Sequence, residues 1–394
     1  MLAKRPAPRI LCCMAGGTSL EVQVYPRIAE IGQAAWDACA GGGNPFVSYA
    51  FLSTLEDSGS VGARTGWHPR YAALRDEGGQ IVAVAPCYAK TNSYGEYVFD
   101  HAWANALERV GERYYPKLQV AAPFSPVPGP RLLRCAGVPA AALAQALEAM
   151  AEELNCSSVH ATFCTREEWE ALGEAGWLQR MGMQFHWENR NYSSFEHFLD
   201  ALSSRKRKAV RRERRDAQAG LTFRALSGAE LTPKLWHAFY EFYASTVDRK
   251  WGGAYLTPEF FPLLGERLGE SVVLIIAERS GKPIAGALNM RSADVLYGRN
   301  WGCVEDVPFL HFELCYYQAI DYAIAHGMKR VEAGAQGEHK IQRGYLPSPT
   351  YSAHFIRHEG LRRAVAQFLQ VELAEIDEAM TAMAAEGPYK KAGE

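Results

Sequence analysis

The residues best suited to chemistry gather in one stretch of the chain, Tyr297–Tyr345, which ends in a turn rich in glycine and charge. Within that turn, Gly334, Gly337 and Gly344 separate polar and titratable side chains. Together with the residue that closes the preceding strand, these side chains are Glu332, Gln336, Glu338, His339, Lys340 and Arg343. Because loops held by a rigid scaffold carry many binding and catalytic residues, this density of titratable groups predicts a site.

Acyl transfer to an amine is the reaction implied by the family resemblance that the second half of the chain carries, and it gives these side chains possible roles. It passes through a tetrahedral oxyanion, so it needs a cation or N–H donors there and a group that accepts the amine proton. Lys340 or Arg343 could supply the cation. Glu332, Glu338 or His339 could accept the proton. The alternative is that Lys340 and Arg343 are surface cations paired with carboxylates, with Glu332 inside a salt-bridge network.

A second histidine, His311, stands near the start of the helix that precedes this turn. At a helix N-terminus the macrodipole disfavours imidazolium, so a neutral His311 could act as a base or a donor. The alternative is a histidine that hydrogen-bonds to the backbone at a helix start. The predicted catalytic residues are thus Lys340, Glu332, His339 and His311, and the predicted substrate contacts of this half are Arg299, Trp301, Gln336, Arg343 and Tyr345.

The first half of the chain has its own aromatic and charged segment, Ser93–Trp103, followed by a short strand. Its polar residues could line an acceptor pocket beside Trp103; they are Glu96, Asp100, His101, Tyr114, Tyr115 and Lys117. We single out Asp100 and His101 as predicted substrate contacts. The alternative is a packed aromatic core with charges on its surface.

The most concentrated charge lies in residues 203–215, where eight of thirteen residues are basic and one is acidic. A helix with this composition suits phosphates, such as those of coenzyme A, a tRNA acceptor stem, a nucleotide-linked precursor or an anionic membrane surface. The predicted phosphate contacts are Arg205, Lys206, Arg207, Lys208, Arg211 and Arg212. No aromatic residue is interleaved, so base stacking is not predicted. The alternative is a solvated helix that pairs with carboxylates of the first domain.

The composition sets limits on the class of protein. With 394 residues, 48% of them hydrophobic, the chain can bury the cores of two domains. A net charge of −2 argues against a protein that is basic all over. Nine cysteines without metal-ligand spacing indicate reduced thiols and a cytoplasmic protein without a metal, and no apolar run is long enough for a membrane helix. Residues 1–20 are predicted to be a disordered leader.

The elements that must position these residues recur in the same order in both halves of the chain. In the second half we predict strands at 221–226, 272–278, 284–291 and 294–301, and helices at 233–248, 257–268, 309–326 and 358–385. The first half gives a hairpin at 69–88, helices at 138–154 and 167–175, and strands at 159–164 and 177–189. This order predicts a mixed α/β (α+β) fold, duplicated as domains 21–189 and 190–394.

The duplicated order resembles two tandem GNAT-type acyltransferase domains, with mixed sheets flanked by helices. The segments LYGRNWGC and HFELCYYQAIDYAIAHGMKRVEAGAQGEHK are similar to FemAB-like proteins of the group related to peptidoglycan biosynthesis. The resemblance covers about residues 44–390 and is strongest from Ser203 to Tyr345. It implies transfer of an amino acid from aminoacyl-tRNA to an amine of a peptidoglycan precursor. A lysine after the last strand supports the transition state in that family, which implies this role for Lys340; His339 replaces the family's aromatic residue.

The donor is left open between aminoacyl-tRNA and acyl-CoA, with no bound cofactor. The Gly-rich pyrophosphate loop typical of GNAT domains is missing, and the acidic segment Val304–Pro308 takes its place in the second half. A backbone nest at a helix N-terminus is what grips pyrophosphate, so this segment weakens the acyl-CoA hypothesis. The expected function is direct acyl or aminoacyl transfer to a peptide or small-molecule amine. The rival hypothesis is a non-catalytic protein whose basic helix holds a phosphorylated or nucleic-acid partner such as tRNA.

Overall fold

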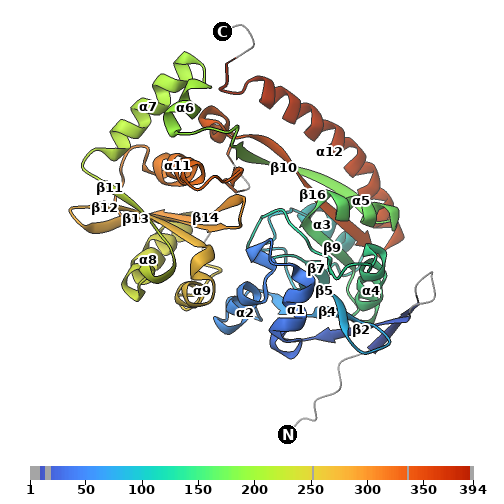
Figure 1. The fold of residues 1–394 in the computed structure, drawn as a ribbon. Coiled ribbons are helices and arrows are strands. Elements are labelled where there is room, and N and C mark those ends of the chain that lie inside the picture. The colour runs from blue at the N-terminus through green and yellow to red at the C-terminus, as the bar shows by residue number, and fades with distance from the viewer. Residues whose placement is uncertain (1–8, 14–18, 251–252, 335–336, 391–394) are drawn as a thin grey trace. The chain divides into compact units, whose positions relative to one another are not determined.

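The computed structural model describes residues 9–13, 19–250, 253–334 and 337–390 (Figure 1). The chain forms two compact units. Unit 1 is Met1–Gly182 with Thr350–Glu375, and unit 2 is Met183–Pro349 with Ile376–Glu394. The predicted domains differ from these units mainly in Thr350–Glu375, which the sequence placed in the second domain.

Unit 2 is built on six strands in the order β11-β12-β13-β14-β15-β10. Their bounds are Thr222–Leu226, Val272–Arg279, Lys282–Arg291, Val295–Cys303, Arg330–Glu332 and Leu178–Glu188, of which Met183–Glu188 lies in this unit. Neighbouring strands are antiparallel except β14 and β15, which are parallel. The strands predicted in this half are therefore confirmed, with shifts of at most two residues at their ends.

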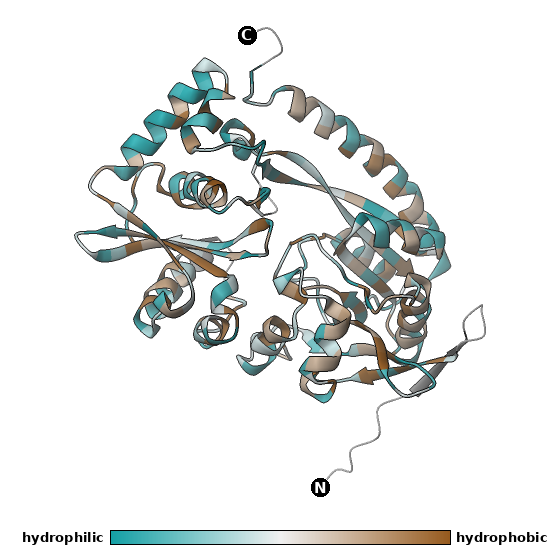
Figure 2. Ribbon diagram, in the orientation of Figure 1, coloured by the Kyte–Doolittle hydropathy of each residue, from teal (hydrophilic) through white to brown (hydrophobic). Residues whose placement is uncertain are grey.

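Helices cover both faces of this sheet (Figure 1). α8 (Pro233–Lys250) and α9 (Phe260–Leu268) lie on one side. On the other lie α6 (Phe195–Asp200), α7 (Ser204–Gln218) and α11 (Gln318–Ala325). A strand that is covered on both faces usually consists of consecutive apolar residues. Val272–Ala277 of β12 is such a segment, and all of its residues are buried. Figure 2 shows the contrast between these hydrophobic strands and the hydrophilic α7.

The helix predicted at 309–326 is interrupted by one wider turn. It consists of α10 (Leu310–Phe312), a π-helical turn at Glu313–Tyr317, and α11. Within the π-helical turn, Glu313 is fully buried and accepts hydrogen bonds from Arg214, Gln218 and Gln318 at 2.8–3.2 Å. Turns of this kind are frequent at functional sites, so its position after β14 draws attention to this end of the sheet.

Unit 1 repeats the strand order of unit 2, but its strands divide over two sheets: β2-β4-β5 lie in one and β6-β7-β9-β16 in the other, and the chain passes between the sheets from β5 to β6. The bounds are Ser19–Tyr25, Tyr71–Arg75, Ile81–Ala85 with Cys87–Lys90, Lys117–Val120, Ser158–Cys164 and Leu346–Ile356, of which Thr350–Ile356 lies in this unit. Only β7 and β9 are parallel. The fourth and fifth strands are thus the parallel pair in both units, which supports the predicted duplication.

Short strands and six helices complete unit 1. The short strands are β1 (Arg9–Cys13), β3 (Trp67–Pro69) and β8 (Leu133–Arg134). The helices are α1 (Gln33–Ala40), α2 (Tyr49–Asp57), α3 (His101–Arg109), α4 (Ala140–Glu153), α5 (Arg166–Glu174) and α12 (Glu359–Ala385), the last belonging to this unit up to Glu375. The helices predicted at 138–154, 167–175 and 358–385 are confirmed.

The predicted disordered leader is wrong in part. β1 pairs with β2 in antiparallel register from Arg9↔Gln23 to Cys13↔Ser19. The apolar residues Ile10–Cys13 add a strand to an edge of the sheet that would otherwise expose unpaired backbone groups. Residues 1–8 and 14–18 of the predicted leader lie outside the described residues.

The sixth strand of each unit comes from the other half of the chain. The Met183–Glu188 part of β10, which follows the first half, pairs with β15. The Thr350–Ile356 part of β16, which follows the second half, pairs with β9. The sequence did not predict β16, because Pro347 and Pro349 at its start are unfavourable in a strand interior. This exchange explains why Thr350–Glu375 belongs to unit 1.

Candidate active site

The sheet of unit 2 opens where its two parallel strands end their pairing. β14 and β15 pair only at Val295↔Arg330, Leu296↔Val331 and Tyr297↔Glu332. β15 ends at Glu332, whereas β14 continues to Cys303. Side chains at this divergence can face a ligand instead of a neighbouring strand. Glu332, predicted from its position at a strand end, lies at that point.

Glu332 is a buried carboxylate with one oxygen unused. Its side chain is 4% exposed, and the guanidinium Nε of Arg330 lies 3.2 Å from Oε1. Oε2 has no hydrogen-bond partner among the described residues. Burial raises the pKa of Glu332 to about 7, against the opposing charges of Arg330 and Arg299. A carboxylate with this pKa and a free oxygen can accept a proton near neutral pH.

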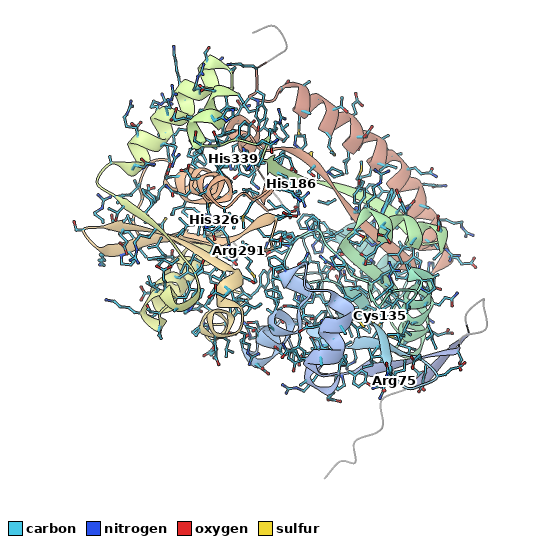
Figure 3. All side chains as sticks on the ribbon, viewed as in Figure 1. Arg75, Cys135, His186, Arg291, His326 and His339 are labelled. Atoms are coloured by element: carbon cyan, nitrogen blue, oxygen red, sulfur yellow. The ribbon has the colours of Figure 1, made fainter. Side chains whose placement is uncertain are left out.

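His186, which is labelled in Figure 3, stands directly opposite Glu332 in the antiparallel register of β10 and β15. Opposed residues of neighbouring strands lie on the same face of a sheet, so the two side chains share one environment. The imidazole is buried, with Nε2 3.3 Å from Oε1 of Gln184. Within the described residues Nδ1 has no hydrogen-bond partner. Burial and the charges of Arg330 and Lys340 lower the pKa of His186 to about 3, so it is neutral.

Lys340 is buried in the turn that follows β15. It belongs to the short helix η6 (Glu338–Arg343), bounded by Gly337 and Gly344 at φ values of 113° and 96° that favour glycine. Its side-chain Nζ donates to the Gly334 carbonyl at 3.0 Å. No carboxylate forms an ion pair with Lys340 in the described ranges. Burial lowers its pKa to about 8.

His186 is related to both of the other buried groups, because it stands opposite Glu332 in the sheet and the charge of Lys340 lowers its pKa. Taking an ion out of water without a counter-ion is costly, and such groups are candidates for function. The alternative that Lys340 is a surface cation paired with a carboxylate is wrong. The part of that alternative that places Glu332 in a salt bridge holds, since Nε of Arg330 lies 3.2 Å from its Oε1.

Arg343 and Tyr345, two predicted substrate contacts, hold the turn in place instead. The guanidinium of Arg343 donates to both carboxylate oxygens of Glu213 on α7 at 3.1 and 3.0 Å. It also donates to the His339 carbonyl at 2.7 Å and lies 3.4 Å from the centroid of the Phe312 ring. Tyr345 is fully buried and donates to the Tyr316 carbonyl at 3.2 Å. Local sequence does not show which arginine of a turn is already paired.

The remaining predicted residues of this half lie along the opening or outside the described chain. His339 is exposed, with Nε2 3.0 Å from the Tyr316 hydroxyl, and its ring centroid is 6.2 Å from that of His311. His311 packs against Trp301 with 4.4 Å between ring centroids. Arg299 is close enough for its charge to act on Glu332. Gln336 lies outside the described residues.

Comparison with known proteins decides the family. The model of the FemAB-like family, described as peptidoglycan biosynthesis/recognition, matches residues 27–391. The chain belongs to the FemAB-like family. No curated protein sequence is significantly similar to it. In the described parts, no helix is long and apolar enough to cross a bilayer, and no three His, Cys, Asp or Glu side chains form a metal site.

Two solved structures resemble this FemAB-like protein. The C-terminal domain of a putative lysylphosphatidylglycerol synthetase from Agrobacterium fabrum has a TM-score of 0.54 at 12% identity, covering 88% of this chain and 98% of that one. The crystal structure of FemX has a TM-score of 0.52 at 13% identity, covering 85% and 98%. At such identities the likeness shows the fold, and that fold is the predicted α/β arrangement of two tandem GNAT-like domains.

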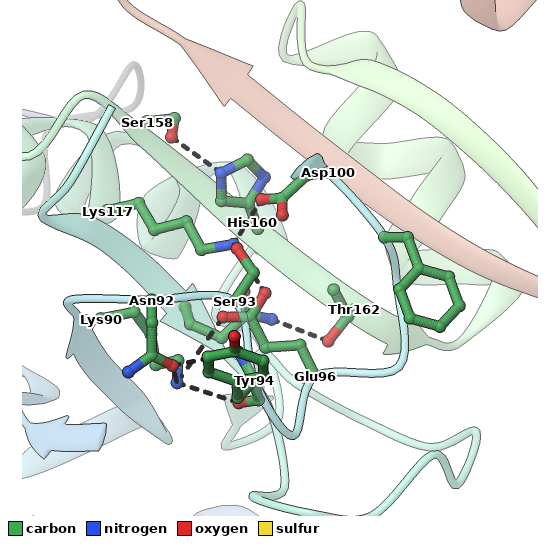
Figure 4. A network of polar contacts seen from close by, with 12 residues as sticks. Lys90, Asn92, Ser93, Tyr94, Glu96, Asp100, Lys117, Ser158, His160 and Thr162 are labelled. Carbon is green, nitrogen blue, oxygen red and sulfur yellow. Dashed lines mark hydrogen bonds and ion pairs between the residues drawn. The ribbon is translucent and has the colours of Figure 1, made fainter. Parts of the chain in front are cut away.

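Unit 1 of the FemAB-like protein contains a buried ionic network (Figure 4). The ammonium of Lys117 lies 2.6 Å from Oε2 of Glu96, donates to Ser93 at 2.8 Å, and also bonds to Oδ2 of Asp100. The Tyr114 hydroxyl donates to the same Asp100 oxygen at 2.6 Å. Burial opposes ionisation of Asp100, yet Lys117 keeps its pKa below the usual range. Asp100, predicted to contact substrate, therefore serves as a counter-ion.

The residue next to Asp100 faces a different environment. His101 is exposed at the start of α3, and its ring stacks on Phe99 with 6.3 Å between centroids. Deeper in unit 1, His160 and His354 occupy opposed positions on β9 and β16, with their Nδ1 atoms 2.7 Å apart. Asp100 is buried in the ionic network, whereas His101 is exposed. These two side chains therefore do not line one acceptor pocket together, which differs from the prediction.

We expect Lys117→Met to destabilise the protein by about 3–5 kcal/mol, because the buried Asp100 would lose its cation and the buried Glu96 would keep only Lys90, 3.8 Å from its Oε1. Equilibrium unfolding in urea measures this loss. Arg109→Met, an exposed substitution on α3, should change stability by about 0.5 kcal/mol or less. Equal effects of the two substitutions would show that the network does not stabilise unit 1.

The basic helix of the FemAB-like protein is α7, and its cations divide into two groups. One group is paired within unit 2: Arg207 with Asp200 at 2.7 Å, Arg211 with Glu196 at 2.5 Å, Arg214 with Glu313 at 3.0 Å and Asp321 at 2.6 Å, and Lys206 with Gln342. The carboxylates that pair with α7 thus come from unit 2 itself, and not from the first domain as the alternative held. The paired group includes Lys206, Arg207 and Arg211, which were predicted phosphate contacts.

Arg205, Lys208 and Arg212 form the second group, which we call the basic stripe. All three are exposed and have no ion pair within the part of the chain that the structure describes. Their spacing of three and four residues puts them on one face of α7. The basic stripe is therefore the part of the predicted phosphate surface that is available to a partner.

Sequence reasoning missed His186. It lies in a strand that was predicted correctly at 177–189, but nothing near it in sequence marks it as functional. Its importance comes from pairing with Glu332, 146 residues further along the chain, through the exchanged strand β10. Only knowledge that β10 pairs with β15 would have identified His186 as part of the site.

Proposed function

We propose that this FemAB-like protein transfers an aminoacyl group from aminoacyl-tRNA to a primary amine of a peptidoglycan precursor. The observation that carries the proposal is the presence of two buried groups near His186. Among the described residues, Lys340 is a cation without a carboxylate partner, and Glu332 is a carboxylate with an unpaired oxygen and a pKa of about 7. The two lie where β14 and β15 diverge. The family described as peptidoglycan biosynthesis/recognition supports the acceptor.

The proposed reaction converts an ester into an amide. The amine nitrogen of the acceptor forms a bond to the carbonyl carbon of the aminoacyl ester, giving a tetrahedral oxyanion. The ammonium of Lys340 stabilises this charge, and Glu332 accepts a proton from the attacking amine. The bond from carbon to the ribose oxygen then breaks, and that oxygen leaves with a proton as the free hydroxyl of the tRNA. His186, neutral and opposite Glu332, keeps an unpaired Nδ1 on the same face of the sheet within the described residues.

Aminoacyl-tRNA is favoured over acyl-CoA as the donor by two features of unit 2. The loop between β14 and α10 carries Glu305 and Asp306 where a GNAT domain would bind pyrophosphate, so it repels phosphate there. The basic stripe on α7 offers a separate surface for the phosphates of a nucleic acid. The domain of the putative lysylphosphatidylglycerol synthetase shares the fold, and its name concerns an aminoacylated product.

The test is discharge of radiolabelled aminoacyl-tRNA in the presence of an amine-bearing peptidoglycan precursor, with acetyl-CoA and longer acyl-CoAs in parallel. Formation of labelled precursor from the tRNA arm supports the proposal. Labelling of the precursor only from acyl-CoA would show that acyl-CoA, and not aminoacyl-tRNA, is the donor. Binding of tRNA without discharge of any donor would instead support the rival of a non-catalytic binding protein.

The basic stripe gives a separate prediction. Replacing Arg205, Lys208 and Arg212 by glutamate should weaken tRNA binding and lower the slope of log K against log salt by about 2–3, because each phosphate contact contributes about 0.7–0.9. Electrophoretic or fluorescence titrations from 50 to 300 mM salt measure the slope.

The matched control reverses three exposed cations elsewhere, Arg109, Lys234 and Lys282, and changes the net charge equally. It should leave the slope unchanged. If both triple variants weaken binding equally, the effect is one of net charge, and the basic stripe is not a binding surface.

A further inference from the structure

A small pocket opens in unit 2 at the far end of β14. It has a volume of about 250 Å³ and lies in the loop that joins β14 to α10. Its lining includes four aromatic or imidazole rings, Trp301, Phe309, His311 and Phe312, and two carboxylates, Glu305 and Asp306. We call it the Trp301 pocket. A volume of this size suits an amino acid and is small for a nucleotide.

The rings of the Trp301 pocket are packed against one another. The centroid of His311 lies 4.4 Å from that of Trp301 and 5.6 Å from that of Phe312. Phe309 lies 6.3 Å from Phe312 and has a φ of 62°, in the left-handed region that a bulky side chain rarely adopts. Such a backbone conformation persists only where its surroundings hold it, and it is frequent at ligand sites.

The charges of the Trp301 pocket are negative. Glu305 is compensated by Arg279, whose Nε lies 2.9 Å from Oε2. Asp306 is exposed, and no cation forms an ion pair with it in the described parts of the chain. No lysine or arginine lines the pocket. Aromatic faces beside a carboxylate attract an organic cation and disfavour a phosphate.

The Trp301 pocket lies close to residues that adjoin the candidate active site. The His311 ring, which lines the pocket, lies 6.2 Å from the ring of His339, the residue before Lys340. Trp301 stands two residues after Arg299 on the same strand, and the charge of Arg299 acts on Glu332. A donor held in the pocket would therefore lie near the part of unit 2 that carries Glu332 and Lys340.

We propose that the Trp301 pocket binds a primary ammonium group of the amino acid to be transferred. Trp301 and His311 supply the ring faces, and Asp306 supplies the counter-charge. The role as a donor subsite rests on the proposed function, whereas ammonium binding itself does not. The pocket would select donors with a charged amine and would exclude the anionic groups of coenzyme A.

Binding is tested without tRNA and without turnover, by calorimetric titration with amino acid methyl esters. Lysine methyl ester is the first probe, and the Nα-acetylated norleucine methyl ester is the uncharged control. Alanine methyl ester carries only the α-ammonium, and Nα-acetyl-lysine methyl ester carries only the side-chain ammonium, so the two distinguish which amine is held. We expect saturable binding of at least one singly charged probe and no detectable binding of the uncharged control.

Two variants locate that binding. Asp306→Asn and Trp301→Leu should each weaken it by about tenfold, whereas Glu266→Gln, on an exposed carboxylate of α9, should leave it unchanged. Thermal unfolding of each variant shows that it is folded. Equal binding of the uncharged ester, an unchanged affinity in folded Asp306→Asn, or competition by coenzyme A would overturn the proposal. Ammonium binding without aminoacyl transfer would contradict the proposed function and leave the Trp301 pocket in place.

Discussion

Lys340→Met is expected to lower kcat for aminoacyl transfer by about 10²–10³-fold, because removal of one preorganised donor to an oxyanion has this effect in other acyl transfers. The substitution keeps the length of the side chain and removes the charge. It should not destabilise the fold, since Lys340 is buried without a carboxylate partner in the described residues and methionine relieves the cost of that burial. Single-turnover discharge of labelled aminoacyl-tRNA measures the chemical step.

The control for this prediction is Lys329→Met, in which the lysine is 74% exposed and paired with Asp294 on the surface of unit 2. It should retain full activity. Lys340→Arg should recover part of the rate, because it keeps the cation but cannot keep its position. If Lys340→Met transfers the aminoacyl group at the wild-type rate, another group stabilises the oxyanion and the proposed mechanism is wrong.

The sequence predicted most helices and strands of the fold, but it did not predict that each unit takes its sixth strand from the other half of the chain. Strands such as β12 and β13, and helices such as α4, follow from local hydrophobic periodicity, which does not depend on partners. The strand β16 was missed, because its first residues include Pro347 and Pro349 and its pairing with β9 spans most of the chain. An exchange of strands between two similar units leaves no local pattern.

For the candidate site, the sequence likewise predicted some of the residues but not their partners. Glu332 and Lys340 stand out because a strand end and a Gly-rich turn adjoin in sequence. Which of the charged residues is already paired depends on distant partners: Arg343 is neutralised by Glu213, and Asp100 by Lys117. His186 belongs to the site only through the register of β10 with β15. Composition cannot distinguish a structural cation from a free one.

Comparison of the two units supports the proposal that the transfer reaction takes place in unit 2. His354 stands opposite His160 in unit 1, as His186 stands opposite Glu332 in unit 2, on equivalent strands. In unit 1 the two opposed side chains bond to each other. In unit 2 neither Oε2 of Glu332 nor Nδ1 of His186 has a partner among the described residues. In unit 1 the opposed pair is closed by its own hydrogen bond, with only Nε2 of His354 unpaired among the described residues, and this difference supports the proposed site in unit 2.

The pH dependence of transfer follows from the same pair of residues. Glu332 must be ionised to accept a proton, so kcat/KM should rise with pH through about 7. Lys340 must be protonated to stabilise the oxyanion, so kcat/KM should fall as pH passes about 8. We therefore expect a narrow bell-shaped profile with its maximum between these two values. Rates measured from pH 5.5 to 9.5 at constant ionic strength define both limbs.

Glu332→Gln should lower kcat/KM by about 10²–10⁴-fold and remove the acid limb, because the amide cannot accept the proton of the amine. The alkaline limb should remain, since it belongs to Lys340. Glu338→Gln, in the same turn but exposed, should keep both limbs and nearly the full rate. If the acid limb survives in Glu332→Gln but is lost in Glu338→Gln, the exposed carboxylate is the proton acceptor. The buried position of Glu332, with its pKa raised by desolvation, is the physical reason to expect the opposite.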